Sequence, residues 1–218
     1  MKPDGLKENL LMSCRKVNFL STARQAAEAL QKGSLVIIPT DTVYGITADP
    51  RVPGAVERLY EAKGRDKSKP IPLLAASITE VEKYGAIFGE LERRLAERFW
   101  PGPLTLVLEV TTGNQNSAFG NRHSNEGFRV PDCEITLAVL RETGGILRVT
   151  SANRSGEPPA LTAEEAIRYL ESFVDAVLDA GAVSGGTPST VVKVENGKIQ
   201  ILRKGAIGSD QLSVISDG

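Results

Sequence analysis

The sequence is poor in the residues that most metal-dependent and nucleophilic enzymes use. Its 218 residues include one histidine and two cysteines. The single His123 excludes zinc sites that need several imidazole ligands. Cys14 and Cys133 form no CxxC pair, which excludes zinc ribbons and thioredoxin-like redox centres, and two cysteines are too few for a disulfide scaffold. Any catalysis must therefore use Lys, Arg, Ser, Thr, Asn, Asp or Glu, or a metal that arrives with the substrate.

The sequence also has no excess of one charge and no long apolar run. Lys and Arg number 26 against 27 Asp and Glu, which gives a formal net charge of -1. A global basic field for binding duplex nucleic acid is therefore absent, although a local basic cleft stays open. No segment has the apolar length of a membrane span, and no secretory pattern opens the chain. We expect a cytoplasmic protein with reduced thiols and no membrane partner.

Strand-like and helix-like segments alternate along the chain, which predicts an α/β protein. The apolar run Leu35–Ile38 is typical of a strand buried on both faces. Asn196-Gly197, between Thr190–Glu195 and Lys198–Arg203, predicts a hairpin with a type I′ turn. Residues 111–127, rich in Gly, Asn and Ser, predict a long surface loop. Further helices are expected at 21–32, 53–64, from 77 onward, 90–99, 134–143 and 162–172, and the last of these begins with a capping box at Thr162. Further strands are expected at 72–76, 104–110, 128–131 and 146–150.

No repeat, low-complexity tract or linker rich in Pro or Ser divides the chain, which predicts one domain. We expect that domain to cover residues 19–208. The mixed, polar residues 1–18 are interpreted as an N-terminal extension, and residues 209–218 as a C-terminal tail.

Four polar clusters lie at the ends of predicted strands, where ligand sites of α/β sheets concentrate. Taken alone, the cluster at 39–45 is interpreted as a turn, and the cluster at 150–156 is either a turn or a loop that hydrogen-bonds phosphate oxygens or a ribose. The cluster at 185–190 fits a Gly-rich turn before a hairpin. The glycines of the last cluster would also allow a close backbone approach to a ligand. The clusters are PTDTVYG at 39–45, KGRDKSKP at 63–70, TSANRSG at 150–156 and GGTPST at 185–190.

The basic cluster at 63–70 has two interpretations. It is either a solvated charge run favoured by the preceding helix dipole, or a phosphate cradle in which Arg65 makes forked hydrogen bonds. Its glycine spacing does not fit a Walker A loop. Ser151 has no GxSxG context, so we do not expect a serine nucleophile. His123 is interpreted as incidental, and Cys133 as a small filler.

Taken together, the order of these and a few further segments along the chain resembles the YrdC-like threonylcarbamoyl-AMP synthases. The resemblance runs from about Ala23 to Ile207, nearly the whole chain. It rests on PTDTVYG (39–45), KGRDKSKP (63–70), WPGPLTLVL (100–108), FRVPD (128–132), TSANRSGEP (150–158) and PSTVV (188–192), with LRKGAI (202–207) closing.

The resemblance implies a single-domain, twisted, open mixed α/β sheet with flanking helices and a positively charged concave cleft. It also implies a reaction in which L-threonine, bicarbonate or CO2, and ATP give threonylcarbamoyl-AMP and pyrophosphate. That product serves the threonylcarbamoyl modification of the anticodon-adjacent adenosine in ANN-decoding tRNAs. Mg²⁺ would enter with ATP and keep several waters, so no protein metal site is expected. Threonylcarbamoyl-transferase proteins and tRNA would be indirect partners.

The resemblance also implies roles for individual residues. The family's Lys–Arg–Ser–Asn tetrad corresponds to catalytic residues Lys63, Arg65, Ser151 and Asn153. The implied ATP-binding residues are Arg65, Lys69, Thr105, Ser151, Asn153 and Arg203, and the implied threonine-binding residues are Thr42, Arg129 and Ser189.

Two positions depart from the family pattern. Leu74 stands where many members carry a histidine, and Cys133 replaces the usual histidine after the RVPD motif. Two alternatives to the synthase are a cleft that binds tRNA or rRNA without adenylation activity, and the carbamoyl-transfer domain of hydrogenase maturation factors. The second normally lies in a much longer chain with zinc-finger and acylphosphatase-like parts, which this sequence lacks.

Overall fold

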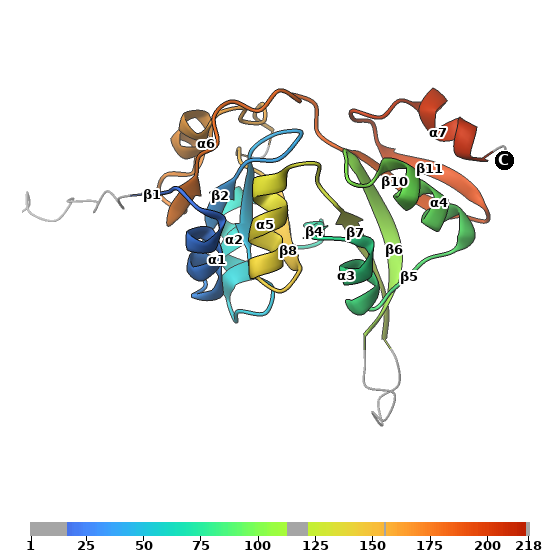
Figure 1. Ribbon diagram of the computed structural model, residues 1–218, viewed down its shortest axis with the longest axis horizontal. Helices are drawn as coiled ribbons and strands as arrows, with labels where there is room; N and C mark the ends of the chain where they lie inside the picture. The colour runs from blue at the N-terminus through green and yellow to red at the C-terminus, as the bar shows by residue number, and fades with distance from the viewer. Residues whose placement is uncertain (1–16, 113–121, 155, 217–218) are drawn as a thin grey trace, which may run out of the picture.

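The computed structural model describes residues 17–112, 122–154 and 156–216. Within these residues, eleven strands form one mixed sheet in the order β1-β9-β2-β3-β8-β4-β7-β6-β10-β11, with β5 pairing β6 at the side (Figure 1). Helices lie on the sheet, so the predicted mixed α/β sheet with flanking helices is confirmed.

The strands are β1 (Asn18–Leu20), β2 (Val36–Ile38), β3 (Gly45–Ala48), β4 (Leu73–Ala75), β5 (Ala86–Ile87), β6 (Leu104–Thr112), β7 (Arg122–Arg129), β8 (Ile146–Ser151), β9 (Ala176–Leu178), β10 (Thr190–Glu195) and β11 (Lys198–Arg203). The helices are α1 (Ala23–Gln31), α2 (Ala55–Lys63), α3 (Ile78–Lys83), α4 (Glu90–Phe99), α5 (Glu134–Glu142), α6 (Ala163–Leu170) and α7 (Ser209–Ser216).

Strand β2 is apolar at every position because both of its faces are buried. Successive side chains of a strand point to opposite faces of the sheet. Val36 and Ile38 belong to one core together with Leu30 of α1, whereas Ile37 belongs to a second core together with Leu59 of α2. The sheet is therefore covered on both faces here, as the apolar run predicts.

Local turn and capping signals are confirmed where they depend on neighbouring residues alone. Asn196 and Gly197 both have a positive φ, of 52° and 71°, as a type I′ turn requires. The Thr162 side chain accepts a hydrogen bond from the Glu165 amide at 3.2 Å and caps α6.

The prediction of a surface loop over residues 111–127 is wrong at both ends of this segment. Strand β6 continues to Thr112, and β7 begins at Arg122. The two strands pair antiparallel, with Thr111 opposite His123, so the ladder satisfies the backbone polar groups despite the polar sequence. Residues 113–121, in the middle of that prediction, and the His123 side chain lie outside what the structure describes.

Both predicted terminal segments contain secondary structure. Asn18 begins β1, which pairs in parallel with β9, while residues 1–16 lie outside the described range. Within the predicted tail, α7 buries Leu212, which is 2% exposed. The division of the chain at residues 18 and 208 stays a prediction.

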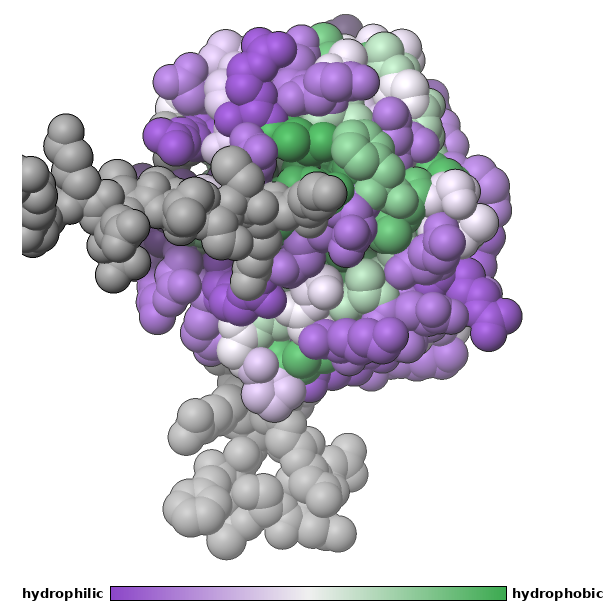
Figure 2. Space-filling model, turned by 90° about the vertical axis from the view of Figure 1, so that its left-hand side faces the viewer, coloured by the Kyte–Doolittle hydropathy of each residue, from purple (hydrophilic) through white to green (hydrophobic). Residues whose placement is uncertain are grey.

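The end of the molecule that carries β1 and α6 exposes some apolar surface. Figure 2 shows this side, with apolar residues near the centre and hydrophilic residues around them. Phe19 of β1 is 65% exposed, and Phe173, which follows α6, is 38% exposed. Among the helices that the structure describes, none combines the length and apolar character that crossing a bilayer requires.

Candidate active site

A solvent-open cavity lies where several strand ends and the loops next to them meet. It encloses about 710 Å³, its open mouth included. Segments far apart in the sequence supply its wall, as expected for a ligand site at the strand ends of an α/β sheet. Its lining residues are Thr40, Thr42, Val43, Gly45, Arg65, Pro72, Leu74, Thr105, Arg129, Val149, Thr150, Ser151, Pro188, Ser189 and Arg203.

The structure brings most of the predicted site residues to this one cavity. The predicted residues that line it are Thr42, Arg65, Thr105, Arg129, Ser151, Ser189 and Arg203. Three others do not line it. Lys63 and Asn153 are buried directly beside Ser151, and Lys69 is exposed.

The charged groups in the cavity wall all have one sign. Arg65, Arg129 and Arg203 contribute guanidinium groups, and no Asp or Glu is among the described lining residues. Burial lowers the pKa of Arg203, and the positive charges of Arg129 and Arg65 lower it further. Arg203 therefore lies close enough to both of the other guanidinium groups to be repelled by them, an arrangement that an anionic ligand would relieve.

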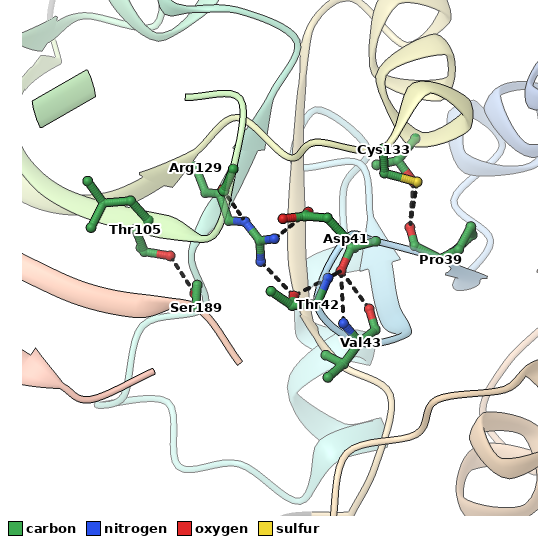
Figure 3. A network of polar contacts seen from close by, with 12 residues as sticks. Pro39, Asp41, Thr42, Val43, Thr105, Arg129, Cys133 and Ser189 are labelled. Atoms are coloured by element: carbon green, nitrogen blue, oxygen red, sulfur yellow. Dashed lines mark hydrogen bonds and ion pairs between the residues drawn. The ribbon is translucent and has the colours of Figure 1, made fainter. Parts of the chain in front are cut away.

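Arg129, at the end of β7, holds the loop after β2 (Figure 3). Its Nη2 pairs with the Asp41 carboxylate, and its Nη1 donates to Thr42 Oγ1 at 2.9 Å. Its Nε donates to the Gly102 carbonyl at 3.0 Å. Burial lowers the pKa of Arg129, and Asp41 acts in the opposite direction. The side chain thus fixes the position of Thr42 in the cavity wall.

The Thr42 hydroxyl is oriented by a second contact inside its own loop. Thr40 Oγ1 donates to the Val43 carbonyl at 2.6 Å and lies 3.0 Å from Thr42 Oγ1. Thr40 Oγ1 also accepts from the amides of Thr42 and Val43, each at 3.2 Å, so the short loop is held by its own hydrogen bonds. Thr42 Oγ1 accepts from Arg129 Nη1 and keeps a second lone pair for a ligand.

A second polar group lies at the other side of the cavity. Ser189 Oγ is 2.8 Å from Thr105 Oγ1 (Figure 3). Arg203 Nη2 donates to the same Ser189 Oγ at 3.0 Å. The Ser189 carbonyl also accepts from Arg203 Nη2, at 2.8 Å. These contacts join β6, β11 and the segment before β10 at one point.

Lys63 occupies a buried position at the last residue of α2 and is 5% exposed. Its Nζ donates to the Ser151 carbonyl at 2.6 Å, to Asn153 Oδ1 at 2.8 Å and to the Asn153 carbonyl. Burial lowers the pKa of Lys63 to about 8, and the charge of Arg65 adds to this effect. Ser151 Oγ donates to Asn153 Oδ1 at 2.6 Å.

Arg65 reaches the cavity because α2 ends two residues before it, at Lys63. Gly64 adopts a left-handed conformation with φ 55°, which closes the helix and turns the chain. Arg65 Nε donates to the Lys69 carbonyl at 2.9 Å, and Nη2 donates to the Pro70 carbonyl at 3.1 Å. Nη1 makes no hydrogen bond to the part of the chain that the structure describes, so it can bind an anion.

The rest of the wall is apolar. Val43, Pro72, Leu74 and Val149 line the cavity, and Leu74 is 4% exposed. Leu74 therefore places an isobutyl group where many family members have an imidazole. Cys133 does not line the cavity. It is half-buried, with its Sγ 4.0 Å from the Pro39 carbonyl, in keeping with a packing role.

Two contacts in the site were not expected from the sequence. The glycines at 185–186 were expected to allow approach to a ligand, but they lie against the chain itself. A Cβ on Gly185 would be 2.3 Å from the Asp41 carbonyl oxygen and 2.7 Å from Thr42 Cα, and the Gly186 amide donates to the Thr42 carbonyl at 2.8 Å. The Tyr44 hydroxyl donates to the Gly181 carbonyl at 2.7 Å and fixes the start of the same segment.

The donor set of the cavity offers little to a divalent cation. Over the described residues, no group of three His, Cys, Asp or Glu side chains gathers in a way that could hold a metal ion. Asp41, next to the cavity, is paired with Arg129. A magnesium ion here would depend on phosphate oxygens and water for its ligands.

The chain is similar to known proteins in sequence and in fold. The Sua5/YciO/YrdC family model, described as telomere recombination, matches residues 28–205. A threonylcarbamoyl-AMP synthase of Bacillus subtilis is 33% identical over 191 residues, which are 88% of this chain and 55% of that protein. A threonylcarbamoyl-AMP synthase of Mus musculus is 31% identical over 210 residues, which are 93% of this chain and 74% of that protein.

Solved structures show the same relationship in three dimensions. Sua5 of Pyrococcus abyssi, solved in complex with L-threonine, matches with a TM-score of 0.80 and 29% identity, over 92% of this chain and 60% of that chain. Escherichia coli YciO has the same fold, with a TM-score of 0.77 at 22% identity. The chain thus spans little more than half of some relatives and all of YciO. By sequence and by fold, it belongs to the Sua5/YciO/YrdC family.

Proposed function

We propose that this protein is an enzyme that makes threonylcarbamoyl-AMP from L-threonine, bicarbonate or CO2, and ATP, and releases pyrophosphate. The observation that carries the proposal is the composition of the cavity wall, which combines three guanidinium groups with threonine and serine hydroxyls and has no carboxylate among its described residues. A fold that matches a threonine-bound Sua5 supports the same substrate. The product would serve the modification of adenosine in ANN-decoding tRNAs by separate transferase proteins.

The proposed reaction makes this protein a nucleotidyltransferase. The threonine amine first takes up CO2 to form a carbamate. A carbamate oxygen then attacks the α-phosphorus of ATP, a new P–O bond forms, and the bond to the β-phosphate oxygen breaks, releasing pyrophosphate. The carbamate oxygen is a weak nucleophile, so catalysis depends on in-line positioning and on neutralising phosphate charge.

The residues of the cavity divide into two groups for this chemistry. Arg65, Thr105 and Arg203 bind the triphosphate, and the exposed Lys69, whose carbonyl accepts from Arg65, adds positive charge. Thr42 and Ser189 bind threonine, and Arg129 orients Thr42. Mg²⁺ enters bound to ATP and adds positive charge to the phosphates.

The alternative function, an RNA-binding cleft without adenylation activity, has less support. Proteins that bind single strands stack bases on aromatic side chains. No aromatic side chain is among the described residues that line the cavity.

Pyrophosphate release tests the proposal. Purified protein with MgATP, labelled bicarbonate and L-threonine should release pyrophosphate and form a product that carries both the label and AMP. Both signals should require L-threonine. Pyrophosphate release that does not depend on threonine would contradict the proposal, as would retention of tRNA at low salt without any adenylate.

A further inference from the structure

The ammonium group of Lys63 has no hydrogen-bond donor to spare. A lysine ammonium carries three N–H groups and no acceptor. Its three partners are the carbonyls of Ser151 and Asn153 and the side-chain Oδ1 of Asn153. All three N–H groups are thus used within the chain.

The buried position of Lys63 also indicates that its ammonium group does not contact a ligand in the cavity. Lys63 is 5% exposed and is not among the residues that line the cavity, whereas Ser151 and Arg65 are. To reach a phosphate, the ammonium would have to give up at least one of these three hydrogen bonds, which is costly for a buried charged group. Arg65, two residues further on, lines the cavity and keeps N–H groups that make no hydrogen bond to the described residues.

The contacts of Lys63 fix the orientation of the Ser151 and Asn153 side chains at the end of β8. Asn153 Oδ1 accepts both from Lys63 and from the Ser151 hydroxyl, and Asn153 Nδ2 donates to the Glu157 carbonyl. The Asn153 amide therefore has one orientation, and the Ser151 proton points toward Asn153. Ser151 Oγ keeps lone pairs with which it can accept from a ligand.

From these contacts we infer that Lys63 is a positioning residue that orients Ser151 and Asn153, and that Arg65 is the cation of the 63–70 cluster that contacts phosphate. This inference rests on the proposed function and changes one expectation within it, since the family resemblance implies that Lys63 binds ATP phosphates. Its burial and the neighbouring charge of Arg65 lower the pKa of Lys63.

Nucleotide affinities separate the two roles. Titration calorimetry with Mg²⁺ compares ATP with adenosine, and the ratio of the two affinities isolates the phosphate contacts. Arg65→Gln should lower this ratio at least about tenfold, the size expected for losing a hydrogen bond to a charged group. Lys63→Met should lower turnover strongly but leave the ratio within about threefold of the wild-type value, below that effect. A ratio that falls as far in Lys63→Met as in Arg65→Gln overturns the inference.

Two variants serve as controls for this comparison. Lys67→Met removes an exposed lysine of the same cluster and should leave turnover unchanged. Lys63→Arg keeps the charge, but a planar guanidinium does not match three converging acceptors, so turnover should stay low. Restored turnover in Lys63→Arg would overturn the inference, because arginine binds phosphate well.

If Lys63→Met does not fold, Asn153→Ala replaces it. Low turnover with the preference for ATP over adenosine kept would support the inference, and normal turnover would contradict it.

A measurement without substrate distinguishes failure of this inference from failure of the proposed function. If the wild-type protein bound no ATP, the proposed function would fail, but the Lys63–Asn153 contact would still be testable. The effects of Lys63→Met and Asn153→Ala on the unfolding midpoint should not be additive, because both remove the same hydrogen bond. Additive effects overturn the inference.

Discussion

Arg129 and Asp41, which are 88 residues apart in the sequence, form a buried ion pair beside the cavity. Their side chains are 7% and 14% exposed. The pair joins the end of β7 to the loop after β2, and the same guanidinium holds Thr42 Oγ1. One contact thus positions a cavity residue and fixes two distant segments.

Removing the carboxylate of this pair should destabilise the fold. Asp41→Ala leaves the Arg129 guanidinium buried without its counterion, which should cost about 3–5 kcal/mol of unfolding free energy. Urea denaturation measures this value. As a control, Glu134→Ala breaks the pair of Arg141 and Glu134, whose side chains are 55% and 77% exposed, and should cost about 1 kcal/mol or less. Equal small losses in both variants would contradict the buried-pair argument.

The sequence predicts those parts of the fold that depend on neighbouring residues. The apolar run of β2, the cap at Thr162 and the turn at Asn196-Gly197 are local signals, and the structure confirms each. The β6–β7 pairing is different, because a polar strand is stabilised by hydrogen bonds to a partner strand and not by an apolar pattern. Composition alone therefore predicts a loop over residues 111–127, although both ends of this segment belong to the β6–β7 ladder.

In the candidate site, too, the sequence predicts what local signals specify and misses what depends on contacts between distant segments. The polar clusters at 39–45 and 150–156 were recognised because short polar side chains after a strand mark the edge of a sheet. Burial of Lys63 cannot be read from a run of charged residues that continues as exposed Lys67 and Lys69. It follows from tertiary contacts with Ser151 and Asn153 across 88 and 90 positions of sequence.

Gly185 should be required for threonine use. Gly185→Ala places a methyl group against the backbone of Asp41 and Thr42, so the segment from Gly181 to Ser189 or the Thr42 loop must move. A shift of about 1 Å at a binding residue can cost up to about a hundredfold in rate, and we expect at least about a tenfold loss of kcat/KM for L-threonine. Steady-state pyrophosphate release measures it. Ser184→Ala, in the exposed neighbour, should be silent, and a normal kcat/KM in Gly185→Ala would contradict the contact.

Leu74 should set the preference for threonine over serine. The apolar wall of Val43, Leu74 and Val149 can contact the threonine methyl group, and one such group in an apolar pocket gives about 10-fold discrimination or more. Leu74→Ala should lower the ratio of kcat/KM for L-threonine and L-serine several-fold. Leu95→Ala is the matched control, because Leu95 is fully buried but does not line the cavity. An unchanged ratio in Leu74→Ala, or an equal change in both variants, would show that Leu74 does not contact the substrate.

The pKa of Lys63 makes a prediction about stability at high pH. Burial lowers this pKa from 10.5 to about 8, so between these values the unfolded chain binds more protons than the folded chain. The unfolding free energy contributed by this group therefore rises with pH, by about 2 kcal/mol between pH 8 and pH 10. Other groups also titrate there, so the quantity to measure is the difference in unfolding free energy between wild type and Lys63→Met at each pH. That difference should grow in favour of wild type as the pH rises from 8 to 10. A constant difference for Lys63→Met over this range would mean that its ammonium is not buried as the structure places it.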